Sequence, residues 1–263
     1  MEPALADSKT SQVSTVLTGV SGSALRVPTV GDDDSHVLFA AEGDELSAAN
    51  PVVSEIVLPW SKIAALVGVS NEAIADAHQS GGGALEIIGR SLARSVANRI
   101  DAAAFGGAAP TNGWAGIRTR HADFHNAGFT DYGTADAFLD GIAKVRTAGG
   151  NPQFALVTPA VAAILAKAKT GAGSALPLFG TSAAEALAET VAGLQLIVSP
   201  SVATGTAYVI DPAALVLAVR KDAEVEIDTS AYFSKDSTAV RVTLRAAFGV
   251  ANPAGIAKIE KIS

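Results

Sequence analysis

The sequence predicts an α+β fold, with one long helix in the first half of the chain and mainly strands in the second. The helix covers 84–104, where apolar residues recur every three or four positions. Beyond residue 194, short apolar segments alternate with turn residues, as expected of strands. Hydrophobic residues make up 49% of the 263-residue chain, which is enough to fill one large core or two interlocked domains.

The N-terminal part is predicted to be extended. Residues 1–23 are rich in serine, threonine and small side chains, so we expect a mobile arm with little to pack against. Residues 24–30 and 52–58 have the composition of strands, and the segment between them is long and acidic. This arrangement predicts a hairpin that reaches away from the body. The acidic residues of the hairpin are Asp32, Asp33, Asp34, Glu42, Asp44 and Glu45.

The long helix has one apolar and one polar face. A shorter helix is predicted to begin at Ser70, and Gly81–Gly83 separates the two. The apolar face of the long helix consists of Leu85, Ile88, Leu92, Val96 and Ile100. Its polar face consists of Glu86, Arg90, Arg94 and Asn98. Glu86 precedes Arg90 by one turn, which is the favoured order for a helical ion pair.

The second half combines short helices with strands. Residues 134–145 predict a helix, Thr158-Pro159 is typical of a helix start, and Ser182–Glu185 has the pattern of a capping box. The predicted strands are 154–157, 195–198, 207–210, 215–219, 225–228 and a long one around 240–248. In the last strand apolar residues alternate with Arg241, Thr243 and Arg245, which predicts one solvent-facing side.

Composition excludes several classes of protein. The chain has no cysteine, so disulfides and thiolate metal sites are excluded. Its formal charge of −7 argues against sequence-specific nucleic-acid binding, which needs a basic face. The sequence has no apolar run long enough for a membrane span and no basic start followed by an apolar run, as a secretory signal would have.

The candidate chemical sites are weak. His121, Asp123 and His125 are spaced like metal ligands on a helix, but they lie in a loop-like segment without a glutamate to act as general base. Asp32–Asp34 lacks the spacing of a calcium loop, and the glycines after Lys169 stand in the wrong order for a phosphate loop. We therefore expect no enzyme, cofactor or metal. The alternative from another class is a small metal-dependent hydrolase that uses His121, Asp123 and His125.

Ordered segments across the chain resemble a known family. They are Ser54–Val67, Ser70-Asn71-Glu72, the helix 84–104 with its ending Asp101–Gly107, Asn112–Ile117, Leu187–Val198, Ala207–Asp211, Leu215–Arg220 and Val240–Pro253. Their order is similar to that of the major capsid proteins of tailed bacteriophages, which have the Hong Kong 97-like fold. The turn before Gly116-Ile117 lacks the proline of the family pattern. The resemblance extends from Leu25 almost to the C-terminus.

The resemblance implies a division of the chain and a role. It assigns an N-arm (1–23), an E-loop (24–58), a P-domain (59–130) with its spine helix, an A-domain (131–218) and C-terminal P-domain strands (219–263). Hexamers and pentamers would form an icosahedral shell around double-stranded DNA in the virion, assembled in the host cytoplasm. An encapsulin-type compartment for cargo enzymes is the alternative with the same fold.

The resemblance also implies partners and contacts. A portal protein is expected as a partner. The sequence leaves undecided whether a decoration protein is also present. Some family members carry a long scaffold domain at the N-terminus. Only 23 residues precede the first E-loop strand here, too few for such a domain, so we expect a separate scaffolding protein. The hairpin acids are expected to contact a neighbouring subunit, with Arg90, Arg94, Arg118 and Arg120 as basic partners. No lysine lies between Arg26 and Lys62, so we expect none of the lysine–asparagine cross-links of some family members.

Overall fold

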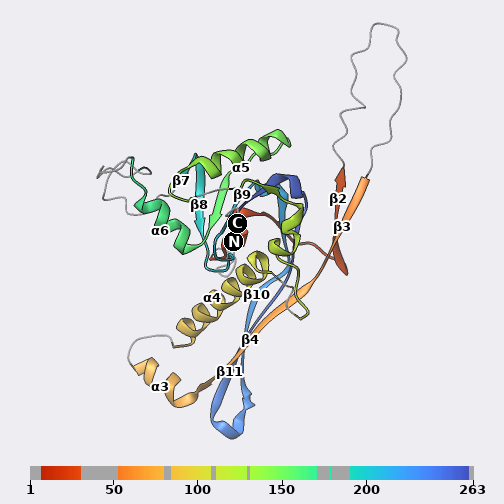
Figure 1. Cartoon of the computed structure of the whole chain (residues 1–263). Coiled ribbons are helices and arrows are strands. Elements are labelled where there is room, and N and C mark those ends of the chain that lie inside the picture. Colours follow the sequence, from red (N-terminus) through yellow and green to blue (C-terminus); the bar gives the residue numbers. More distant parts are fainter. Residues whose placement is uncertain are drawn as a thin grey trace.

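The computed structural model describes residues 7–30, 53–79, 84–107, 111–128, 131–170, 178 and 190–260. It confirms the α+β fold. A four-stranded sheet has the order β1-β10-β11-β4, a six-stranded sheet has the order β5-β12-β9-β6-β8-β7, and β2 and β3 form a separate hairpin (Figure 1). None of the helices within these ranges is long and apolar enough to cross a membrane.

The four-stranded sheet carries the long helix. It consists of β1 (Thr15–Thr18), β4 (Ser61–Ser70), β10 (Leu215–Tyr232) and β11 (Ser237–Val250). The long helix α4 (Ala84–Phe105) packs on this sheet, after the shorter α3 (Asn71–Gln79). The predicted apolar face of α4 is confirmed where the side chains are described, because Leu92, Val96 and Ile100 are buried.

Strand β10 is one strand where the sequence predicts two. The predicted segments 215–219 and 225–228 are both paired with β11, and the pairing shifts register between Val219 and Lys221 and again between Lys221 and Glu224. Such irregularities add residues to one strand and disturb the alternation of apolar and polar side chains. The break in the sequence pattern therefore marks bulges within a continuous strand.

The six-stranded sheet forms the second half of the fold. Its strands are β5 (His125–Asn126), β6 (Phe154–Val157), β7 (Thr190–Val191), β8 (Leu194–Val198), β9 (Thr206–Ile210) and β12 (Ile256–Glu260). Helix α5 (Asp136–Thr147) contacts β9 and β12. Strand β12 pairs with β9, so residues 256–260 belong to this sheet and not to that of β11.

Short helices connect the strands. Helix α6 (Pro159–Lys167) is capped as predicted, because the Thr158 hydroxyl accepts a hydrogen bond from the Val161 backbone N–H at 3.3 Å. The predicted capping box at 182–185 lies outside the described residues. The remaining turns are the 3-10 helices η2 (Ile117–Asp123), η3 (Pro212–Ala214), η4 (Phe233–Lys235) and η5 (Pro253–Gly255).

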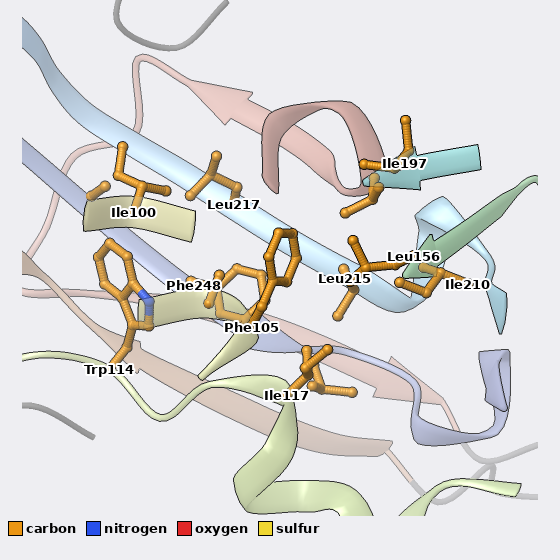
Figure 2. Packing of buried hydrophobic residues seen from close by; sticks show 14 of the residues in the cluster. Ile100, Phe105, Trp114, Ile117, Leu156, Ile197, Ile210, Leu215, Leu217 and Phe248 are labelled. Carbon is orange, nitrogen blue, oxygen red and sulfur yellow. The ribbon is translucent and has the colours of Figure 1, made fainter. Parts of the chain in front are cut away.

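One hydrophobic cluster joins the two sheets. Figure 2 shows Phe105 and Ile117 next to Leu215 and Phe248, with Leu156 of the second sheet close by. Trp114 packs against Phe248 with a distance of 6.4 Å between ring centroids. Because the cluster includes residues from both sheets, they form a single packed body.

The expectation of an N-terminal arm with little to pack against is wrong for residues 8–18. Helix α2 (Lys9–Val13) lies against α4, and β1 pairs in parallel with the first part of β10. The side chains of Ser8, Thr10 and Val13 are buried. Small polar residues suggest solvation when read alone, but here their small volume allows close approach to α4 and their donors find an acceptor there.

Candidate assembly surfaces

The β2–β3 hairpin forms a small sheet of its own. Strands β2 (Ala24–Val30) and β3 (Val53–Pro59) pair antiparallel over seven positions, which confirms the two predicted strands. The hairpin stands away from the two larger sheets (Figure 1). An exposed ion pair between Arg26 and Glu55, at 2.8 Å, bridges its strands. The six predicted contact acids, Asp32, Asp33, Asp34, Glu42, Asp44 and Glu45, lie outside the described residues.

The base of the hairpin is anchored in the four-stranded sheet. Leu25 and Leu58 are buried against Val216, Ala218 and Ala247. At Gly249, on the neighbouring strand, an added Cβ would lie 2.3 Å from Leu58 Cδ2. The close approach of Leu58 therefore depends on the absence of a side chain at position 249.

The four predicted basic partners are all exposed, and two of them have partners within the chain. Arg90 pairs with Glu86 at 2.7 Å, as the helical spacing predicts. Arg120 pairs with Asp123 at 2.9 Å. Arg94 and Arg118 form no ion pair among the residues that the structure describes, although the charge of Arg118 acts on Glu260 and Tyr208.

A basic recess lies between β4, α4 and the loop 111–114. Its volume is about 280 Å³, and Lys62, Arg99 and Trp114 are among the residues that line it. Lys62 and Arg99 are exposed and have no acidic partner in the described ranges. The indole N–H of Trp114 is buried and has no hydrogen-bond partner among the residues that the structure describes. Sequence reasoning missed this recess because its residues come from three separate segments.

A sequence profile of the Phage capsid family matches residues 2–261. The chain belongs to this family. It is a major capsid protein, and it builds the shell of a virion. No curated protein matches it.

Solved capsids share the fold. The chain is similar to a structure from Microbacterium phage Oxtober96 (16% identity, 97% of this chain and 91% of that chain, TM-score 0.75) and to one from Mycobacterium phage Bobi (14%, 97% and 91%, 0.74). It is also similar to the capsid of a native GTA particle (18%, 100% and 91%, 0.72). At these identities the likeness shows the Hong Kong 97-like fold that the sequence predicts, and the family match shows the capsid role.

The histidine segment of the capsid protein forms structural contacts. His121 Nδ1 lies 3.2 Å from the Tyr208 hydroxyl, and His121 Nε2 lies 2.7 Å from Glu260 Oε1. Asp123 pairs with Arg120, and His125 lies in β5. No group of three metal-ligating side chains is found in the described part of the chain.

This cluster also shifts the pKa values of its members. Burial alone would raise the pKa of Glu260, but the hydrogen bond and the charge of His121, helped by Lys258 and Arg118, lower it. Burial raises the pKa of Tyr208 far above its usual value, and it does the same for Tyr132. The two hydroxyls therefore remain neutral, and the Tyr132 hydroxyl donates to the backbone carbonyls of Gly205 (2.9 Å) and Ile259 (3.1 Å). These contacts attach β12 to the rest of its sheet.

Proposed function

We propose that this capsid protein assembles as hexamers and pentamers into an icosahedral shell that encloses double-stranded DNA. The observation that carries the proposal is the β2–β3 hairpin, whose strands pair only with each other within the described residues. A two-stranded hairpin is marginally stable in water by itself. A neighbouring subunit would supply the missing packing, and repetition of that contact would close a shell.

The proposed division follows the family pattern. Residues 1–23 form the N-arm, 24–58 the E-loop, 59–130 the P-domain, 131–218 the A-domain and 219–263 the C-terminal strands. The two larger sheets support a division into P- and A-domains, because α4 packs on one sheet and α5 on the other. The pairing of β12 with β9 favours moving 256–260 to the A-domain.

We further propose that the hairpin acids contact basic side chains of the neighbouring subunit. Of the predicted partners, Arg94 and Arg118 are the better candidates, since Arg90 and Arg120 already pair within the chain. Lys62 and Arg99 of the basic recess add two more cations. Each exposed pair contributes only about 0–1 kcal/mol, but a shell repeats the contact at every subunit.

The proposed shell is not covalently cross-linked and the protein is not an enzyme. The segment between Arg26 and Lys62 has no lysine to act as a nucleophile, and Lys62 lies in β4 on the body of the molecule. Boiled particles should therefore run as one band near 26.4 kDa on a denaturing gel. A ladder of covalent oligomers would contradict this.

The proposed partners are a separate scaffolding protein and a portal protein during assembly in the host cytoplasm, with a decoration protein as an optional addition. Electron microscopy and sedimentation of the purified protein test the core proposal. We expect capsomers or closed shells, and double-stranded DNA in particles isolated from virions. A compact monomer under all conditions would contradict shell formation, and cargo enzymes in place of DNA would favour the encapsulin alternative.

A further inference from the structure

One buried carboxylate in α4 receives the N-terminal segment. Asp101 is 5% exposed. Its Oδ1 accepts hydrogen bonds from the Ser8 hydroxyl (2.7 Å), the Thr10 hydroxyl (2.7 Å) and the Thr10 backbone N–H (2.8 Å). Its Oδ2 accepts one from the Lys9 backbone N–H at 3.0 Å. All four donors come from three consecutive residues that lie far from Asp101 in the sequence.

Asp101 and residues 8–10 depend on each other for their hydrogen bonds. A buried carboxylate is costly unless hydrogen-bond donors surround it, and this one obtains its donors from residues 8–10. Conversely, without Asp101 two backbone N–H groups and two hydroxyls of the segment would lose their acceptor in a buried place. Within the segment, Ser11 Oγ donates to the Ser8 carbonyl and Ser14 Oγ to the Thr10 carbonyl, and Thr15 Oγ1 donates to the Pro212 carbonyl at 3.1 Å.

The segment held in this way covers one edge of the four-stranded sheet. Thr15–Thr18 pair in parallel with Val216–Val219, on the side of β10 that faces away from β11. A four-residue parallel strand is a weak attachment by itself. The chain then leaves the sheet through Gly19 (φ 71°) and Gly22 (φ 118°). The register of β1 therefore depends on the anchor at residues 8–10.

We propose that Asp101 is the positioning residue of an intramolecular docking site, and that residues 8–18 are its occupant. The seated segment closes the edge of β10, which would otherwise offer Val216–Val219 for strand pairing with a second copy. The docking site is inferred from hydrogen bonds and strand pairing within one chain, so it does not depend on the proposed shell. Only its consequence for association rests on the capsid role.

Trypsin digestion measures whether residues 8–18 are docked against α4 and β10. The Lys9–Thr10 peptide bond contains the Thr10 N–H that donates to Asp101, and the Lys9 N–H on its other side donates to Asp101 as well. The exposed Lys169–Thr170 bond offers the same dipeptide as an internal control. In the full-length chain we expect Asp101→Asn to increase cleavage after Lys9 about tenfold or more, with the rate after Lys169 unchanged. Glu86→Gln makes the same change of charge on the exposed face of α4 and should leave both rates unchanged.

A second variant covers the case in which Asp101→Asn does not fold. Thr10→Val keeps the shape of the side chain and removes one of the four donors, so cleavage after Lys9 should rise by a smaller factor, about threefold to tenfold. Unchanged protection of Lys9 in the folded variants would overturn the anchor.

An engineered cysteine pair tests whether the occupant belongs to the same chain. The native chain has no cysteine, so Thr15→Cys with Val216→Cys, at paired positions of β1 and β10, gives an unambiguous readout. After oxidation of assembled material, we expect a monomer band on a non-reducing denaturing gel. A dimer or longer ladder would overturn the intramolecular site. Shells seen by microscopy in either case would leave the proposed function intact.

Discussion

The two ends of strand β10 differ although they belong to one continuous strand. Residues 215–219 are buried, between β1 and β11 and beneath the hydrophobic cluster of α4. Residues 224–231 are exposed, even though 224–228 also pair with β11. There the apolar side chains of Val225 and Ile227 are about half exposed, and Phe233 at the adjoining turn is 87% exposed. The inner end is completed by its own chain, and we infer that the outer end is completed by another subunit.

The charged side of the outer end supports the same interpretation. Glu226 and Arg241 form an ion pair across β10 and β11, which keeps the solvent-facing side polar. Val225 and Ile227 lie on the opposite side of the strand and are about half exposed, whereas their partners in β11, Val242 and Val240, are buried in the chain's own hydrophobic cluster. Apolar groups gathered on one side of a projecting ribbon are typical of an association surface.

The largest expected effect is at the inner end. Leu217→Ala leaves a cavity at a fully buried position, so the free energy of unfolding should fall by about 2–5 kcal/mol, measured by urea denaturation of the unassembled protein. Ile227→Ala at the outer end is the matched control and should change it by less than about 0.5 kcal/mol. Similar losses of unfolding free energy for both variants would contradict the difference in burial between the two ends of β10.

The next effect is at the base of the hairpin. Gly249→Ala places a methyl group against Leu58, so we expect destabilisation of about 1–3 kcal/mol. Leu58→Ala provides a double-mutant cycle, because removal of the leucine side chain should make the alanine at 249 tolerable. Strictly additive effects in denaturation experiments would show that the two positions do not interact.

At the outer end, a substitution should affect association and not folding. Phe233→Ser removes an exposed aromatic ring, so the free energy of unfolding should stay within about 0.5 kcal/mol of the wild type. Because aromatic anchors contribute strongly to interfaces, sedimentation should show weaker association, by about tenfold or more. Ser234→Ala in the same turn is the control. Unaltered association of Phe233→Ser would exclude this turn from the interface.

The smallest effect concerns pH. The folded pKa of Glu260 is lower than its ordinary value of 4.5, so its contribution to stability is present above pH 4.5 and is lost as the pH falls through the folded pKa. The partly exposed contact with His121 limits this contribution to below about 1 kcal/mol. The stability difference between wild type and Glu260→Gln should therefore shrink from about pH 5 to pH 3. A constant difference would contradict the assignment.

Sequence periodicity predicted the elements whose burial is regular. The helix 84–104, the strand Phe154–Val157 and the cap at Thr158 were found as predicted, because each signal is local. In β11 the predicted alternation holds over 240–245. It ends at Ala246–Val250, where both sides of the strand are buried, and the β2–β3 hairpin covers Ala247 and Gly249.

What sequence reasoning missed depends on contacts between distant segments. Asp101 has no local feature that marks it as the acceptor for Ser8 and Thr10. The bulges of β10 interrupt its pattern, so one strand was predicted as two. The capsid role was predicted from the order of segments along the chain and is shown by the family match, whereas the contacts of the hairpin acids stay a prediction.

Hydrogen exchange before and after assembly tests most directly whether neighbouring subunits complete the exposed regions. Peptides that cover 215–219 should be protected to the same extent in unassembled protein and in shells, because their own chain already buries them. Peptides that cover 224–233 should exchange more slowly in shells. Equal exchange of 224–233 in both states would contradict the assignment of this end of β10 to a subunit interface.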